Sequence, residues 1–264
     1  MAVRIISYGG GVQSTALVIL AATGQIDADA AVFANVGDDS EHPLTLPFVR
    51  DVVMPWADER GFPVHETQRV RRDGTPETLL QKLHRTERSV DIPVRMANGA
   101  PGNRSCTADF KIKVVDKWLR DHGVTKDNPA TVLIGFSTDE LERANKKRTS
   151  NLSVPEYPLL DLGWDRSRCQ ALIVETFGQP APKSSCWFCP FHRPQMWAEM
   201  RRDEPDLFWQ SVDLERMLNE RRERLGKDHV WLTRFNKPLD VAITEAQPTL
   251  FDGPEGCDEG YCWT

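Results

Sequence analysis

The sequence contains no apolar run approaching the ~20 residues that a membrane-spanning helix needs. Its first residues form only a short apolar run that leads directly into a glycine turn, so we expect no secretory signal peptide. An excess of positive charge is also missing, because the net charge at pH 7 is -6. We therefore expect a cytoplasmic protein without membrane association that is not, as a whole, a strongly basic nucleic-acid binder. A local basic groove is still compatible with this charge.

The sequence also lacks a histidine cluster, since its six histidines are scattered along the chain. The sequence has six cysteines, and in a cytoplasmic protein these favour metal, sulfur or redox chemistry over structural disulfides. The alternative is that several are small core residues, which is common for cysteine outside disulfides. Because 40% of the residues are hydrophobic and 27% are charged, we expect an ordinary packed core.

Strand and helix signals alternate through the first part of the chain. The predicted strands are 3–6, 30–34, 64–67 and 131–134. The predicted helices are 14–23, 48–60, 76–85, 110–122, 166–177 and 205–225. This alternation is typical of an α/β protein with a doubly wound parallel sheet. Because strand signals stop near residue 165, we expect an α/β domain at 1–163 and a helical, cysteine-containing region at 164–264.

A glycine turn separates the first predicted strand from the first predicted helix. This arrangement can hold phosphate, because glycines let the backbone approach an anion and the first helical amides point towards it. The turn lacks the Gly-Lys-Ser/Thr ending of a Walker loop and the spacing of a dinucleotide-binding loop. The alternative is a glycine turn without a ligand. The predicted phosphate-binding residues are Ser7, Tyr8, Gly9, Gly10, Gly11, Gln13, Ser14 and Thr15.

This segment resembles the PP-loop of the N-type ATP pyrophosphatases, in which Ser-Gly-Gly-x-Asp-Ser follows the first strand. It is most similar to the variant in phosphoadenosine phosphosulfate reductase-like proteins, with a Ser-aromatic start at 7–8, a glycine pair at 10–11 and a Ser-Thr end at 14–15. The resemblance implies an adenine nucleotide alpha-hydrolase-like fold that binds ATP and Mg²⁺. Gln13 stands where the family has Asp, so the role of that acid is not carried over.

Polar residues follow the second predicted strand, where a doubly wound sheet binds its ligands. We predict that Asn35 and Asp39 bind the ribose or help to hold Mg²⁺, and a solvent-exposed turn is the alternative. They correspond loosely to an acidic Asp-Thr-Gly-x-Glu segment of the family that this chain resembles.

A second polar segment follows the last predicted strand. Gly135, Glu140 and Arg143 match a Gly-x-Arg-x-x-Glu-x-x-Arg segment of the same family, while Ser137 replaces its first Arg. We predict that Gly135 belongs to the nucleotide site and that Arg143 stabilises charge on the leaving phosphates. A salt bridge at the start of a helix is the alternative.

Two cysteines, Cys186 and Cys189, are spaced so that both can bind one metal ion, and zinc, iron–sulfur and dithiol interpretations all remain open. The layout resembles a branch of the family with Arg-x-Cys-Thr-x-x-Phe/Leu-Lys, a cysteine on a helix, and Lys-Ser-x-Cys-x-x-Cys-Pro-Phe. That branch includes the ATP pyrophosphatases of DNA phosphorothioation systems, and the resemblance runs from residue 3 to about residue 195. It implies a 4Fe–4S cluster, with Zn²⁺ as the alternative. The implied ligands are Cys106, Cys169, Cys186 and Cys189.

The resemblance implies a two-step reaction, in which an acceptor oxygen attacks the α-phosphate of ATP and a sulfur nucleophile then displaces AMP. We assign catalytic roles to Ser14, Lys111 and Arg143. The expected acceptor is nucleic acid, with DNA favoured over tRNA, and the expected partner is a cysteine desulfurase or another sulfur donor.

Two alternatives belong to other functional classes. One is a sulfonucleotide reductase in which Cys257 on the C-terminal tail is the nucleophile, since a thiol near the end of the chain can carry sulfur into a site. The other is a non-catalytic, zinc-stabilised nucleotide-binding subunit. For both Cys257 and Cys262, an unused tail is a further interpretation.

Overall fold

The computed structural model describes residues 2–86, 88–144 and 150–244, apart from the side chain of Arg143. The chain forms two compact units, each built from two separate stretches. Unit 1 comprises the described residues of Met1–Thr78 and Thr107–Ser185, and unit 2 those of Leu79–Cys106 and Cys186–Cys262. The division differs from the predicted boundary after residue 163, because the chain leaves unit 1 at Thr78 and returns to it at Thr107.

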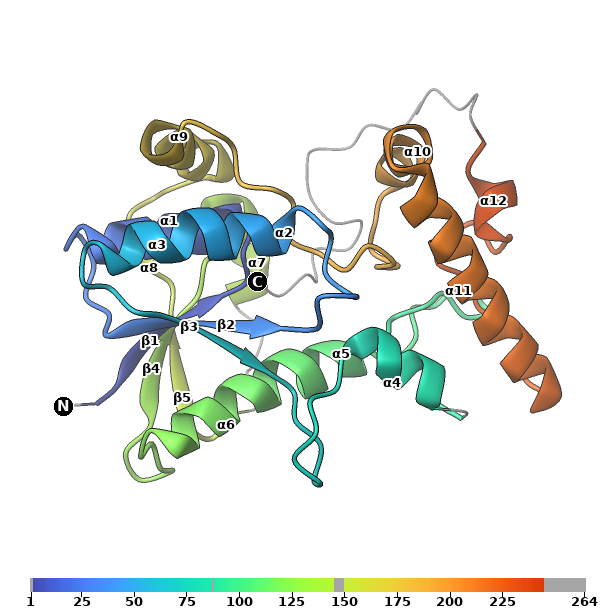
Figure 1. The fold of residues 1–264 in the computed structure, drawn as a ribbon, viewed down its shortest axis with the longest axis horizontal. Coiled ribbons are helices and arrows are strands. Elements are labelled where there is room, and N and C mark those ends of the chain that lie inside the picture. Colours follow the sequence, from blue (N-terminus) through green and yellow to red (C-terminus); the bar gives the residue numbers. More distant parts are fainter. Residues whose placement is uncertain (1, 87, 145–149, 245–264) are drawn as a thin grey trace. The chain divides into compact units, whose positions relative to one another are not determined.

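A five-stranded, all-parallel sheet forms the centre of unit 1 (Figure 1). The strand order is β3-β2-β1-β4-β5. The strands are β1 (Arg4–Tyr8), β2 (Ala30–Asn35), β3 (Val64–Gln68), β4 (Ala130–Leu133) and β5 (Ser153–Glu156). The parallel α/β arrangement predicted from the sequence is confirmed, but β5 was not predicted. It is an edge strand that contains Pro155, a residue without a backbone N–H that is usually found at sheet edges.

Helices cover both faces of the sheet, and the alternation of side chains along β1 shows why. Ile6 packs in a core cluster with α1 (Val12–Ala22) and α9 (Arg166–Phe177). Ile5 packs in a second cluster with α6 (Lys113–Asp121), on the opposite side of the sheet (Figure 1). A parallel sheet must be buried on both faces, and the apolar strands predicted from the sequence meet this requirement.

The remaining elements are mostly short. In unit 1, or at its boundary, they are α2 (Thr45–Pro47), the π-helical η1 (Phe48–Val53), α3 (Met54–Asp58), α5 (Ser105–Thr107), the π-helical η2 (Ala108–Ile112), the 3-10 helix η3 (Thr138–Glu140), α7 (Leu141–Ala144) and α8 (Pro158–Asp161). In unit 2 they are α4 (Leu79–Arg85), α10 (Pro194–Asp203), α11 (Pro205–Arg224) and α12 (Leu239–Ala242). Within the described ranges, none of the helices combines the length and apolar character needed to cross a bilayer.

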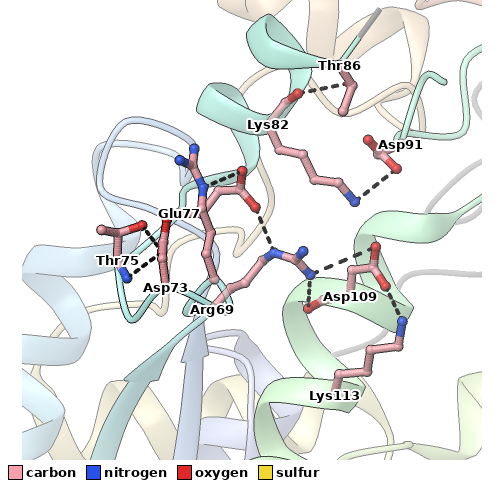
Figure 2. Close-up of polar contacts among 10 residues, drawn as sticks. Arg69, Asp73, Thr75, Glu77, Lys82, Thr86, Asp91, Asp109 and Lys113 are labelled. Atoms are coloured by element: carbon pink, nitrogen blue, oxygen red, sulfur yellow. Dashed lines mark hydrogen bonds and ion pairs between the residues drawn. The ribbon is translucent and has the colours of Figure 1, made fainter. Parts of the chain in front are cut away.

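A hairpin follows β3 and is held by a buried carboxylate. Val70 and Pro76 form an antiparallel bridge, and Gly74 in the turn has a positive φ of 86°. The Glu77 side chain is fully buried between two arginines, and its oxygens lie 2.9 Å from Arg69 Nε and 2.9 Å from Arg71 Nε. Figure 2 shows Arg69 between Glu77 and the side chain of Asp109 at the start of the helical stretch η2–α6. Glu77 therefore joins the two arms of the hairpin, and Arg69 links the hairpin to Asp109.

Candidate nucleotide-binding site

The strand order of the sheet changes direction at β1. From β1 the chain proceeds to β2 and then β3 on one side, whereas β4 and β5 lie on the other side. In open parallel sheets, ligands bind outside the carboxyl ends of the strands where the order reverses in this way. The loops that follow β1 and β4 meet at this position, and they contain the predicted phosphate-binding residues and Gly135.

The turn between β1 and α1 has the backbone geometry of an anion-binding loop. Gly10 has a φ of 72°, a left-handed conformation that side chains disfavour. A Cβ atom at Gly10 would lie 3.1 Å from Thr45 Cγ2 and 3.1 Å from Val49 Cγ2. Gly11 is the N-cap of α1, so no side chain caps the first amides, and the first turn carries no acidic residue. These amides are therefore left for a ligand, with the positive end of the helix dipole behind them.

Hydroxyl groups brace this loop from inside. The Gly9 backbone N–H donates to Ser14 Oγ at 3.2 Å, and Ser14 Oγ donates to the Gly11 carbonyl at 3.2 Å. Thr15 Oγ1 donates to the Tyr8 hydroxyl at 3.4 Å, and both side chains are buried. Burial raises the pKa of Tyr8 above its usual value, so the phenol stays neutral. The structure thus places Ser14, Thr15 and Tyr8 where they fix the shape of the loop, while Ser7 is partly exposed in β1.

The loop after β4 packs directly against the first turn of α1. A Cβ atom at Gly135 would lie 2.8 Å from the carbonyl carbon of Gln13 and 2.8 Å from the backbone nitrogen of Ser14. Real Cβ atoms do not approach backbone atoms this closely, so a glycine is needed here for the two loops to meet. The structure therefore brings Gly135 against the first turn of α1, and its place in a nucleotide site stays a prediction.

Ser184 reaches the turn between β1 and α1 from a distant part of the sequence. Its hydroxyl donates to the carbonyl of Gly9. The carbonyl of the next residue, Ser185, accepts from the backbone N–H of His42 at 2.9 Å. The segment at 184–185 therefore lies along the loops that follow β1 and β2, and it fixes their spacing.

The side-chain amide of Asn35, at the end of β2, is engaged in hydrogen bonds within the protein. Both of its amide hydrogens are donated at 2.8 Å, one to Asp38 Oδ1 and one to Glu66 Oε1, and its Oδ1 accepts from the Gly37 backbone N–H at 2.7 Å. Arg50 pairs with the same two carboxylates, 2.7 Å from Asp38 and 2.6 Å from Glu66. Asn35 therefore shapes the turn after β2 and keeps no amide hydrogen for a ligand.

The acidic residues after β2 differ in burial. Asp39 is exposed, and its oxygens accept from the hydroxyls of Ser40 at 2.7 Å and Thr78 at 2.9 Å. Glu41 is only 4% exposed, and burial raises its pKa, while the positive charge of Lys111 and a hydrogen bond from the Val36 backbone act in the opposite direction. The structure thus places the predicted catalytic Lys111 within electrostatic reach of a buried carboxylate that the sequence did not predict. Perturbed carboxylates of this kind are common in functional sites.

No protein-family model, curated protein or solved structure matched this chain.

The predicted cysteine ligands have different surroundings. Cys169 lies on α9 in the apolar core of unit 1, where burial raises the pKa of its thiol to about 12. Cys106, Cys186 and Cys189 belong to unit 2 and are partly exposed. The ligating form of cysteine is the thiolate, so metal binding at Cys169 would require its thiol to lose the proton.

Among the residues that the structure describes, no group of three or more His, Cys, Asp and Glu side chains is arranged to hold a metal ion. Metal binding by the four predicted cysteines, Cys106, Cys169, Cys186 and Cys189, stays a prediction, and no reaction step is assigned to a metal or cluster. The side chain of Arg143, together with Cys257 and Cys262, lies outside the described residues.

The burial of Cys169 predicts a difference in thiol reactivity. At pH 8 a thiol with a pKa of about 12 is ionised in roughly one molecule in 10,000. We expect iodoacetamide to label Cys189 in the native chain and to leave Cys169 unlabelled until the protein is denatured, as measured by mass spectrometry of the peptides. Equal labelling rates for the two cysteines in the native protein would contradict this placement.

Arg166 is a site residue that the sequence analysis missed. It is the first residue of α9, and its guanidinium Nη1 donates to the side-chain oxygen of Gln13 at 3.2 Å. The two residues are 153 positions apart in the sequence. The only local signal is Asp165, a helix-capping residue type before a predicted helix, which locates the start of α9 but says nothing about its neighbours.

Proposed function

We propose that this protein is an ATP pyrophosphatase of the PP-loop type, which cleaves ATP to AMP and pyrophosphate and adenylates an acceptor. The observation that carries the proposal is the turn from β1 to α1. It combines a left-handed Gly10, an N-terminal helix cap without a side chain and a position where the strand order reverses. Together these features favour a polyphosphate ligand bound mainly by backbone amides.

Cationic side chains suit this chemistry. Pyrophosphate is the leaving group, so negative charge grows on the phosphates that the loop amides bind, and the protein contributes mainly by positioning and charge neutralisation. Ser14 keeps the loop amides in place, and Lys111 and Arg143 are the proposed cationic residues. The acceptor oxygen attacks the α-phosphate, which becomes bonded to the acceptor as the bond to pyrophosphate breaks.

Mg²⁺ is part of the proposed site. This ion is usually held by one or two carboxylates together with substrate phosphates. Asp39 fits that requirement, because it is exposed just beyond the carboxyl end of β2 and its oxygens accept hydrogen bonds from the hydroxyls of Ser40 and Thr78. When bound, the ion would neutralise charge on the phosphates. Asp39 and Glu41 are the residues that would hold it.

The proposed acceptor is nucleic acid, with DNA favoured over tRNA. In the second step a sulfur nucleophile from a cysteine desulfurase or another donor displaces AMP. The resemblance of the segments around Cys106 and Cys186 to those of DNA phosphorothioation enzymes supports this choice. The fold itself does not select an acceptor, since nucleotide-binding α/β sheets serve many reactions.

The test is the identity of the nucleotide product. We expect ATP labelled at the α-phosphate to give labelled AMP, with pyrophosphate as the second product, in the presence of Mg²⁺, DNA and a cysteine desulfurase with cysteine. Release of ADP and phosphate would contradict the proposal. Binding of ATP without AMP formation, with DNA or tRNA and with or without the sulfur donor, would favour a non-catalytic subunit. Sulfite release from phosphoadenosine phosphosulfate would favour the reductase.

A further inference from the structure

The side-chain amide of Gln13 connects three segments of unit 1. Its Nε2 lies 3.4 Å from Ser137 Oγ and 3.3 Å from Glu140 Oε2, both on or next to η3, and its oxygen accepts from Arg166 Nη1 at 3.2 Å. Gln13 is only 5% exposed and Ser137 is fully buried. A buried amide with partners on both sides has one favourable orientation, so Gln13 fixes the position of Arg166 relative to the first turn of α1.

The backbone around Arg166 is fixed independently of this contact. Its N–H donates to Asp139 Oδ2 at 2.7 Å, and the Thr138 N–H donates to the carbonyl of Trp164 at 2.9 Å. Asp165 caps α9 by accepting from the Arg168 N–H at 2.7 Å. The start of α9 is therefore attached to the loop after β4, and the Arg166 side chain extends from a rigid base towards the phosphate loop.

The guanidinium of Arg166 keeps its charge available. Its side-chain partner is the neutral amide oxygen of Gln13, and among the described residues no carboxylate lies within ion-pair distance of it. Arg50 is a contrast within the same unit, because it is held between the carboxylates of Asp38 and Glu66. A guanidinium has five N–H donors in a planar fork that suits phosphate oxygens, and only one donor is engaged here.

We propose that Arg166 contacts the β- and γ-phosphates of ATP and that Gln13 is its positioning residue. This inference rests on the proposed function and adds a residue to its site. The loop amides hold the pyrophosphate portion, since the α-phosphate must stay open to the acceptor. Arg166 is attached to the second residue of α1 and therefore faces that same portion. Gln at position 13, where the resembled family has Asp, leaves the charge of Arg166 for the ligand because a carboxylate there would neutralise it.

The test compares the binding of ATP and AMP, because only ATP carries the phosphates in question. We expect Arg166→Gln to weaken Mg²⁺–ATP binding about 10- to 100-fold, the typical effect of losing a hydrogen bond to a charged group, and to change AMP binding less than about twofold. Gln13→Glu should reproduce the loss selectively for ATP by pairing with Arg166. The matched control is Arg168→Gln on the same helix, whose guanidinium lies 5.2 Å from the Trp164 ring centroid and whose loss should not affect either ligand.

Titration calorimetry and thermal unfolding of the same samples separate the possible results. Unchanged ATP binding by Arg166→Gln would overturn the inference, and so would an equal loss of ATP and AMP binding, which indicates a structural role. If Arg166→Gln does not fold, Arg166→Lys keeps the charge but loses the fork, and an ATP affinity equal to that of the unmodified chain would equally overturn it. An unmodified chain that binds no ATP would instead remove the proposed function itself.

Discussion

Gly10→Ala is expected to lower the rate of pyrophosphate release about 100-fold or more, the scale of losing a backbone donor to the reacting phosphates. The added methyl group has two effects. It places an alanine at a φ of 72°, which costs about 1–2 kcal/mol of stability, and it puts a Cβ atom 3.1 Å from both Thr45 and Val49. The loop must shift to relieve these contacts, so its amides move away from the phosphates.

Gly24→Ala is the matched control for that experiment. Gly24 follows the end of α1, also has a φ of 72°, and a Cβ atom there would meet nothing within 4 Å. The two variants therefore share the same backbone strain and differ in crowding and in position. We expect Gly24→Ala to lose less thermal stability than Gly10→Ala, because it adds no crowding, and we expect an effect on pyrophosphate release from Gly10→Ala alone. Equal activity of the two variants would show that the turn does not bind the phosphates.

The centre of the sheet could be predicted because its strands are buried on both faces. The segments at 30–34 and 131–134 are short apolar runs, and both are strands in the structure. The edge strand β5 lacks this signal, since Val154 is 52% exposed and Pro155 interrupts the run. The helix α10 was missed for a different reason. It is separated from α11 by a single residue, Glu204. A proline begins each of the two helices, Pro194 in α10 and Pro205 in α11, but only the second start was predicted.

The division into two units could not be predicted, because it depends on contacts between residues far apart in sequence. In the sequence, the stretch Leu79–Cys106 lies between two segments of unit 1. In the structure, it forms unit 2 together with the chain from Cys186 onwards. The candidate nucleotide-binding site could be predicted only in part, for the same reason. Glycine at positions 10 and 135 signals a close approach of backbones, whereas nothing local indicates that Gln13 contacts Arg166. Motifs identify the residues that hold the backbone in a special conformation, and the tertiary fold selects their side-chain partners.

Glu77 is the buried residue whose loss should affect the stability of unit 1 most directly. Its carboxylate contacts Arg69 and Arg71, whose side chains are 24% and 35% exposed. Arg69 also donates to the backbone carbonyl of Asp109 at 3.4 Å, and Lys113 holds the Asp109 carboxylate at 2.6 Å (Figure 2). This group of charges links the hairpin after β3 to the helical stretch η2–α6 on one face of the sheet.

Glu77→Ala is expected to lower the free energy of unfolding by about 3 kcal/mol, near the lower end for breaking a buried ion pair, because both arginines can regain water. Glu77→Gln should cost less, since its amide oxygen can still accept one hydrogen bond. Urea denaturation followed by circular dichroism measures both. Asp121→Ala is the control, because it removes a carboxylate from the exposed pair with Lys117 on α6 and should leave the urea midpoint unchanged. Equal midpoints for Glu77→Ala and the unmodified chain would show that this carboxylate does not hold the hairpin in place.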